Sequence, residues 1–285
     1  MKRDWKAYLG IAAVAALVIV ASGCEKLKAR DHLNHGVQAY KSAKYPEAVE
    51  HFKAAVDLDP TFITARLYLA TAYMSQYIPG AESPENIEMH RAAKDHFLKV
   101  LEQDPKDKIA VASLASLHYS QAQGMPKLED KLAKLDEANQ WYTKLAEVDP
   151  ENKEAYYSLG VIVWAKWYPA LMDARVKLGM KAEDPGPLKD KKVKAELKEK
   201  WGASVEEGLK HFEKALSIDP EYDDAMAYMN LLIRERADLA DDAAGYKKDV
   251  EAADEWVQKA LQTKKIKAAR AAEKAQQGIV QDTAK

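Results

Sequence analysis

Cysteine is almost absent from this sequence, and so are the common signatures of catalysis. Cys24 is the single cysteine in 285 residues, so no disulfide can form within the chain. The 12 glycines form no phosphate-cradling loop. The sequence also has no H-E-x-x-H zinc motif, no G-x-S-x-G nucleophile elbow and no C-x-x-C-H haem motif. These absences favour a protein that is not an enzyme and binds no cofactor.

An excess of charge of one sign is also missing. The chain has 43 lysines and arginines against 45 acidic residues, with no basic stripe. Nucleic-acid binding is therefore not expected. His32 and His35, beside Asp31, could supply two zinc ligands. No third ligand follows at a recognisable spacing, so no metal site is predicted, and we expect His90 and His96 to be solvent-exposed or peripheral.

One long apolar run is present, at the N-terminus. Lys2 and Arg3 precede Tyr8 to Val20, which is almost wholly apolar, and small residues follow it. This layout is typical of an export signal. Ala21-Ser22-Gly23-Cys24 resembles the lipobox of bacterial lipoproteins, although Ala21 stands where that family usually has leucine. There are two alternatives. The segment could be a membrane-spanning anchor that is never removed, or the signal could be cleaved at another site, leaving Cys24 unmodified.

The lipobox resemblance implies a location as well as a modification. Residues 1–23 would be a signal peptide that is removed, and Cys24 would carry acyl chains including palmitate. Residues 24–28 would be a short tether, and the membrane would be a partner through the lipid. Glu25 is not the aspartate associated with inner-membrane retention. We therefore expect a lipid-anchored protein of the bacterial cell envelope, on the periplasmic face of the outer membrane rather than the inner membrane.

Beyond this segment, alternating β-branched runs are absent, and Ala, Leu, Lys and Glu dominate, which predicts an almost entirely helical chain. An Asp-Pro pair recurs at Pro60, Pro105, Pro150 and Pro220, at intervals of 45, 45 and 70 residues. Proline cannot extend a helix and disfavours helical backbone in the residue before it. Each Asp-Pro therefore predicts a helix end, and the two equal intervals of 45 residues predict a repeated unit.

The segments before these prolines share a second pattern. Each has a small residue, a large apolar residue four positions later, and an apolar residue three positions after that, all on one helical face. The triplets are Ala48, Phe52 and Ala55; Ala93, Phe97 and Val100; Ala138, Tyr142 and Leu145; Gly208, Phe212 and Ala215; and Ala253, Val257 and Ala260. An earlier helix of four of the five units has Gly36, Ala70, Ala115 or Gly160 at one close-packing position.

Together these positions resemble the signature of tetratricopeptide repeats (TPRs), over roughly residues 29–265. The resemblance implies an all-α fold, a right-handed α-α superhelix of about five helix pairs with an insertion in the fourth. The units would be residues 29–62, 63–107, 108–152, 153–222 and 223–262, followed by a polar helical tail at 263–285.

Four of the units are longer than the TPR template. Units two, three and five have 11 surplus residues each, read either as longer helices with looser turns or as loop. The fourth contains an insertion at about residues 166–203, read either as a binding surface or as an elongated helical hairpin. Ser204 and Glu207 have capping-box spacing, which predicts that the second helix of this unit begins there.

TPR arrays usually bind an extended peptide or a partner helix on their concave side. The TPR template places seven residues on that side as candidate binding residues, mostly of types that dominate interfaces: Tyr40, Met74, Tyr119, Tyr157, Trp164, Tyr168 and Arg234. Packing between repeats could bury several of them instead. The sequence thus favours a protein-binding scaffold, with envelope or outer-membrane protein assembly suggested by analogy. The alternatives are an enzyme or enzyme accessory with a site in the insertion, and a binder of small molecules or glycans. The partner and the oligomeric state are not indicated.

Overall fold

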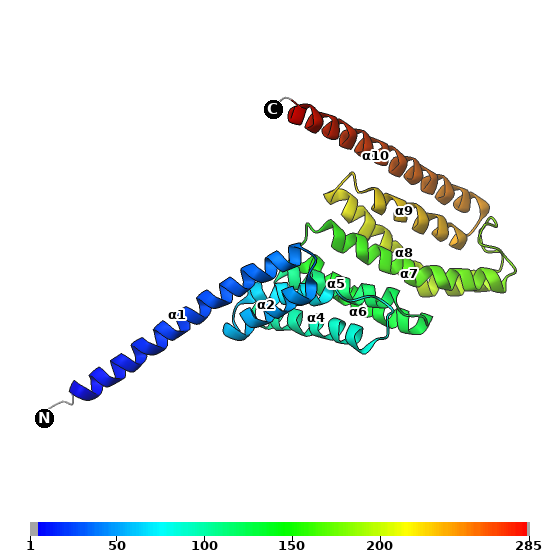
Figure 1. Cartoon of the computed structure of the whole chain (residues 1–285). Coiled ribbons are helices and arrows are strands. Elements are labelled where there is room, and N and C mark those ends of the chain that lie inside the picture. The colour runs from blue at the N-terminus through cyan, green and yellow to red at the C-terminus, as the bar shows by residue number, and fades with distance from the viewer. Residues whose placement is uncertain (1–4, 284–285) are drawn as a thin grey trace. The chain divides into compact units, whose positions relative to one another are not determined.

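The computed structural model describes the backbone of residues 5–283 and the side chains of residues 23–274. Within the described backbone there are ten α-helices, one short 3₁₀ helix and no strand (Figure 1). The helices are α1 Trp5–Lys41, α2 Tyr45–Leu58, α3 Ile63–Met74, α4 Pro84–Gln103, α5 Lys108–Gln123, α6 Leu128–Val148, α7 Lys153–Lys177, α8 Lys191–Ile218, α9 Asp223–Arg236, η1 Ala237–Leu239 and α10 Ala243–Thr283. The all-helical prediction is confirmed.

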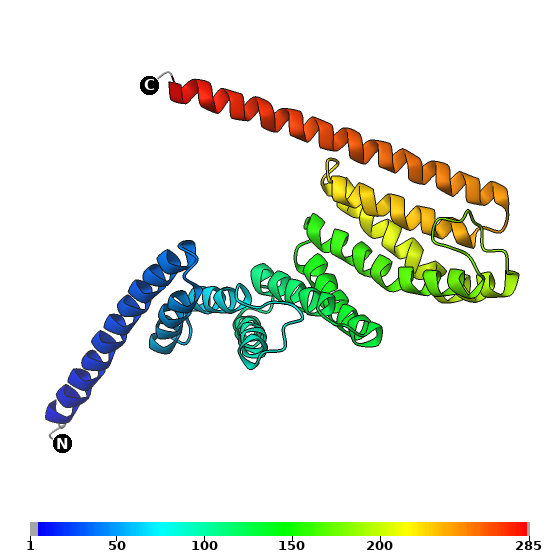
Figure 2. The same cartoon turned by 45° about the vertical axis from the view of Figure 1, so that its right-hand side comes forward.

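The chain forms two compact units, Met1–Trp141 and Tyr142–Lys285, which divide within α6. In the first unit α1 packs on α2 and α3 packs on α4, and contacts from α2 to α3 and from α4 to α5 continue the series. In the second unit α7 packs on α8 and α9 packs on α10, with α8 against α9 (Figures 1 and 2). The first helices of successive pairs also touch, α1 with α3, α3 with α5, and α7 with α9. Each unit is therefore a series of stacked helix hairpins.

The Asp-Pro pairs end the second helix of a hairpin by the same local chemistry. The backbone N–H of Asp59, Asp104 and Asp219 makes the last helical hydrogen bond, at 2.8–3.0 Å. The carboxylate of each aspartate then accepts a hydrogen bond from the backbone N–H two residues later, at 2.9–3.1 Å. This is the turn that aspartate favours, and the intervening proline has no N–H to continue the helix. The prolines Pro60, Pro105, Pro150 and Pro220 are all solvent-exposed.

The repeated small and aromatic residues meet in the cores. Phe52, Phe97 and Phe212 are fully buried. A Cβ built at Gly36 would lie 2.5 Å from the ring of Phe52, and one at Gly160 would lie 2.6 Å from that of Phe212. Glycine is therefore required where these helix pairs approach most closely. The remaining template residues Ala48, Ala93, Ala138, Tyr142 and Ala215 are buried as well.

Longer helices account for much of the extra length in the extended units. Helices α4 and α6 have 20 and 21 residues, against 14 in α2. The turns before them, residues 75–83 and 124–127, are also longer than the turn at residues 42–44 of the first hairpin. In the second unit, α9 is followed by η1 and three further residues before α10 begins. The reading as longer helices with looser turns is therefore the one that the structure favours.

The insertion of the fourth unit extends α7 and α8 into a long hairpin. The Trp167 and Trp201 rings lie 6.2 Å apart between the two extended helices, and Trp167 is fully buried. Helix α8 begins at Lys191, capped by Asp190, and continues without a break. The predicted helix start at Ser204 is therefore wrong: residues on both sides extend the helix, and the S-x-x-E spacing falls in its interior.

The loop between α7 and α8 is attached to its own unit. Arg175 forms a buried ion pair with Asp238 of η1 and donates hydrogen bonds to the carbonyls of Lys181 and Asp184 in the loop. Leu188 is buried, and its N–H donates to the Asp238 carbonyl at 3.0 Å. The insertion therefore packs on η1, as the elongated-hairpin alternative expected.

Helix α1 continues through residues 24–28, and Cys24 is solvent-exposed. Most of the predicted signal segment lies outside the described side chains. Within residues 23–274, no helix is long and apolar enough to cross a membrane.

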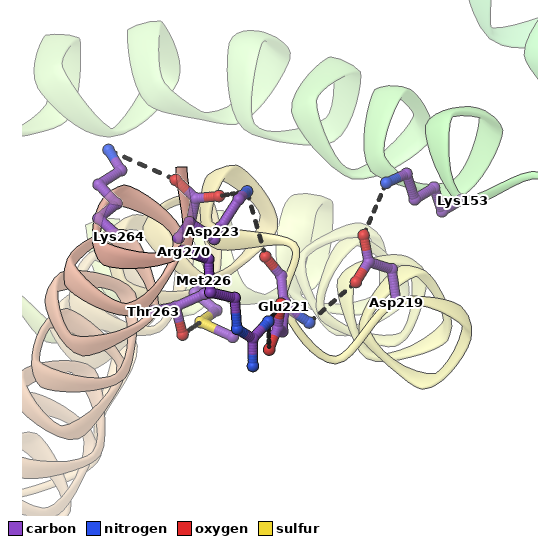
Figure 3. Close-up of polar contacts among 9 residues, drawn as sticks. Lys153, Asp219, Glu221, Asp223, Met226, Thr263, Lys264 and Arg270 are labelled. Atoms are coloured by element: carbon purple, nitrogen blue, oxygen red, sulfur yellow. Dashed lines mark hydrogen bonds and ion pairs between the residues drawn. The ribbon is translucent and has the colours of Figure 1, made fainter. Parts of the chain in front are cut away.

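The predicted polar tail begins as a continuation of α10. Lys264 lies 3.8 Å from Asp223, and Arg270 lies 2.7 Å from Glu221 (Figure 3). Lys267 also pairs with Asp223. Residues 264–270 of this helix therefore contact the turn between α8 and α9.

Candidate partner-binding surface

Helices α7 and α9 are positioned by polar contacts at their first turns. The Asn152 side chain caps α7 by accepting a hydrogen bond from the Ala155 N–H at 3.1 Å. Lys153, in the first turn of α7, lies 2.6 Å from Asp219, which ends α8 just before α9 begins (Figure 3). Tyr222, the residue just before α9, donates a hydrogen bond to Glu154 in the same first turn of α7, at 2.5 Å. These contacts set the register of the two helices.

Four aromatic side chains lie together on these helices. Tyr157, Trp164 and Tyr168 lie on one face of α7, and Tyr228 lies on α9; we call them the aromatic row. The Tyr228 ring is 5.7 Å from that of Tyr157 and 5.3 Å from that of Trp164, edge-on in both cases. Tyr168 stacks on Trp164 at 5.3 Å and is 37% exposed. The row therefore combines specific aromatic packing with surface open to solvent.

A buried carboxyl group adjoins this row. The Trp164 indole N–H donates to Glu235 Oε1 at 2.9 Å. Glu235 Oε2 is buried and has no hydrogen-bond partner among the described residues. Burial, with a contribution from Asp238, raises the pKa of Glu235 to about 7, against the opposing effect of the Trp164 hydrogen bond. This carboxyl group therefore changes its charge near neutral pH.

A pocket of about 300 Å³ opens beside the aromatic row. Its wall is made by residues of α7, the α7–α8 loop, α9, η1 and α10. They are Tyr168, Leu171, Met172, Arg175, Ala182, Glu183, Asp184, Arg234, Glu235, Asp238 and Tyr246. Two predicted binding residues, Tyr168 and Arg234, thus line the same pocket, and the insertion supplies part of the wall.

The seven predicted binding residues fall into two groups. The structure brings together Tyr157, Trp164, Tyr168 and Arg234 in the second unit, whereas Tyr40, Met74 and Tyr119 belong to the first.

In the first unit the predicted residues are engaged in packing. Tyr40 lies 2.9 Å from the Ser75 hydroxyl and packs its ring against Tyr45 at 5.3 Å. Met74 packs against the core of the second hairpin, and Tyr119 is half-buried. Packing between helices therefore occupies much of the Tyr40 and Met74 surface, as the alternative reading of these positions expected.

Sequence reasoning missed two members of the surface, Tyr228 and Glu235. Both lie on the same face of α9 as Leu231, three residues before it and four after it. Leu231 is an inward position of the TPR template, so extending that helical spacing in both directions would have found them. Their partners on α7 could not be found in this way.

The histidines differ partly from expectation. His32 Nδ1 lies 3.3 Å from His51 Nδ1, and the His35 ring stacks on His51. No set of three or more potential ligands that could hold a metal occurs within residues 23–274. His90 and His96 were expected to be exposed or peripheral, and the structure shows that they are not fully exposed. Both are partly buried, and each has one ring nitrogen that is inaccessible and lacks a hydrogen-bond partner in the described part of the chain. Packing of α4 against neighbouring helices covers them.

No family model and no curated protein matches this sequence. Among solved structures, the chain is similar to MamA, residues 41 to the end, from Desulfovibrio magneticus RS-1. The TM-score is 0.53 and the identity 15%, over 84% of this chain and 96% of that one. A MamA RS-1 double mutant gives 0.55 and 14%, over 85% and 97%. YrrB, described as a TPR protein with an unusual peptide-binding site, gives 0.43 and 18%, over 81% and 84%; a score of this size adds nothing to the fold assignment.

At these identities the MamA likeness concerns the fold alone. It agrees with the serial packing of helix hairpins and with the small and aromatic residues buried between them. The protein has the all-α fold of tetratricopeptide repeat arrays.

Proposed function

We propose that this protein is a non-enzymatic scaffold that binds a peptide or helix of another protein along the aromatic row of α7 and α9. The observation that carries this proposal is the row itself, in which Tyr157, Tyr228, Trp164 and Tyr168 contact one another in series and Tyr168, at the end, is 37% exposed. Rigid, partly exposed aromatic side chains supply much of the binding energy at protein interfaces. The row lies on α7 and α9, which are the first helices of two successive helix pairs. In TPR arrays, the first helices usually form the surface that binds a partner.

The same proposal includes attachment to a membrane of the bacterial cell envelope. Its support is the lipobox-like sequence ending at Cys24 and the solvent exposure of Cys24 on α1. Stable anchoring needs more than one acyl chain, and the lipoprotein class carries several. We place the protein on the periplasmic face of the outer membrane, with a role in envelope or outer-membrane protein assembly by analogy with other TPR-like lipoproteins.

Photo-crosslinking in native envelopes tests the binding surface. A crosslinking amino acid on α7 beside the row, in place of Ala165, should capture a defined partner. Tyr168→Ala should lower capture about tenfold, because loss of an interface aromatic typically costs 1–2 kcal/mol or more. Trp256→Ala is the matched control: this half-buried aromatic lies on α10 in the same unit, beneath Lys259 at 4.2 Å. Equal capture by the wild type and Tyr168→Ala, with both chains folded by circular dichroism, would refute the proposed surface.

The lipid anchor has a separate test. Mass spectrometry of the mature protein should find an acylated N-terminal residue at position 24, and Cys24→Ser should abolish both the acylation and release from the signal segment. A mature chain that retains residues 1–23, or that carries an unmodified thiol at position 24, would refute the predicted lipid anchor. The proposed partner-binding surface would not be affected by that result.

A further inference from the structure

We infer that the pocket beside the aromatic row takes a cationic side chain, lysine or arginine, of the bound partner. This inference rests on the proposed function and specifies the chemistry of the same surface. Three features of the described residues support it: the occupied arginines, the surplus of carboxylates, and the unpaired oxygen of Glu235 beside an exposed aromatic ring.

The two arginines of the pocket wall are already paired. The Arg175 guanidinium forms a buried ion pair with Asp238 and donates to two loop carbonyls. Arg234 pairs with Asp254 and donates to Asn230 at 3.2 Å. Neither arginine therefore leaves a net positive charge free to receive an anionic ligand.

The remaining charges of the wall are negative. Glu183, Asp184 and Glu235 line the pocket, and none of them forms an ion pair with a lysine or arginine within residues 23–274. Among the described residues, the hydrogen-bond donor to the Asp184 carboxylate is the backbone N–H of Lys181, at 2.7 Å. A wall with paired arginines and unpaired carboxylates attracts a cation, and partial enclosure strengthens that attraction relative to open solvent.

The third feature gives the ligand a defined position. Glu235 Oε2 is a buried acceptor without a donor among the described residues. A buried acceptor without a hydrogen bond destabilises the folded protein, because its hydration is lost and not replaced. A ligand that donates a hydrogen bond to this oxygen removes that penalty, which favours binding. An ammonium or guanidinium group would make a charge-assisted hydrogen bond there, while its aliphatic stem or its charged plane packs against Tyr168 in the same wall.

Binding of a cation to this pocket should strengthen as the pH rises through neutrality. The pKa of Glu235 lies at about 7, so the unliganded carboxyl group is largely protonated at lower pH. A cation binds the ionised form, so its affinity falls as Glu235 becomes protonated. The other titratable or charged groups that line the pocket, from each surrounding element, are Arg175, Glu183, Asp184, Arg234, Asp238 and Tyr246.

Two peptide pools test the inference with the full chain in detergent. One pool has random nonapeptides with a central arginine, and the other has citrulline at that position, which keeps the shape but is neutral. The wild type should retain the arginine pool about tenfold better at about pH 8, with a smaller preference at about pH 6. Glu235→Gln, whose amide oxygen can still accept from Trp164, should abolish the preference. Glu255→Gln, an exposed glutamate on α10, is the matched control and should keep it.

The outcomes separate this inference from the proposed function. Equal retention of the two pools by the wild type, or an unchanged preference in Glu235→Gln, overturns the cation pocket. The proposed function would still stand if Tyr168→Ala lowers crosslinking to the envelope partner. An unchanged crosslinking yield in Tyr168→Ala removes the surface itself, whatever the pools show.

Discussion

Two partly buried histidines of α4 should make the stability of the first unit depend on pH. Burial is the main cause that lowers the pKa of His90 from 6.5 to about 4, with His118 and nearby lysines adding to it. Burial likewise lowers the pKa of His96 to about 4, with Arg66 as the next contributor. Their rings pack on tyrosines, at 5.0 Å for His90 on Tyr77 and 5.9 Å for His96 on Tyr73.

The sign of the effect follows from proton binding. The pKa of each histidine is lower in the folded chain than in the unfolded chain. Between the two pKa values the unfolded chain therefore binds a proton at this histidine, while the folded chain does not. The contribution of these two histidines to stability is therefore fully present above about pH 6.5, and it is lost as the pH falls toward about 4. Between about pH 7 and pH 5, one such histidine would cost at most about 2 kcal/mol. Each ring keeps part of its surface in water, so we expect roughly half of this, about 1 kcal/mol per histidine.

The assay must report on α4 itself, because Glu235 acts with the opposite sign in the second unit. Its pKa is raised from 4.5 to about 7, so it favours the folded state as the pH falls through the same interval. Hydrogen exchange of α4 peptides, corrected for intrinsic rates, gives the local free energy of opening. Aspartates such as Asp59, whose pKa is lowered by the Thr61 hydrogen bond, lose their contribution only at lower pH.

The variants His90→Gln and His96→Gln should each reduce the difference between about pH 7 and pH 5 by about 1 kcal/mol. His35→Gln is the control: this exposed histidine is in the same unit, and its replacement should leave the difference unchanged. If both α4 variants retain the full wild-type difference, or if α4 becomes more protected at lower pH, the argument from burial is refuted.

Two further predictions concern packing in the second unit. Gly160→Ala should lower the free energy of unfolding by about 1–2 kcal/mol, because its Cβ would meet the Phe212 ring at 2.6 Å and overpacking outweighs the gain in helix propensity. Gly202→Ala, whose Cβ would have no neighbour closer than 3.8 Å, should instead raise it by about 0.5–1 kcal/mol; equal effects in urea unfolding would contradict the packing argument. Asp238→Asn should cost about 3 kcal/mol by leaving the Arg175 charge buried without its carboxylate. Hydrogen exchange of residues 178–190 should then accelerate, and an unchanged rate would show that this pair does not hold the loop.

Local rules in the sequence predicted the fold because they act over few residues. Asp59, Asp104 and Asp219 end helices through their own side chains and the following proline. The glycine at Gly36 is required by a close contact with Phe52, which belongs to the next helix of the same pair. Both signals lie within one hairpin, so their spacing is readable along the chain.

Some predictions were wrong or incomplete for two reasons. The burial of a residue can depend on neighbouring helices, and a short sequence pattern can be compatible with more than one local structure. The spacing of Ser204 and Glu207 occurs both at helix starts and inside helices, and the long α8 decided between them. His90 and His96 are polar residues that could have been exposed, but packing around α4 covers part of each ring. Tyr157, Trp164 and Tyr168 on α7 and Arg234 on α9 were predicted for the candidate surface. Tyr228 and Glu235 on α9 were missed, although they continue a helical spacing.

By itself, the amino-acid sequence determined the helical class, the hairpin ends and the small residues at close approaches, because each depends on backbone geometry within a few turns. Only the tertiary structure decided that Trp164 would bond Glu235 and that Tyr168, Arg234 and the insertion would share one pocket. These residues lie up to about 70 positions apart in the chain. Their meeting depends on how α7, α9 and the loop before α8 pack together, and no spacing along the sequence encodes the resulting distances or the burial that raises the pKa of Glu235.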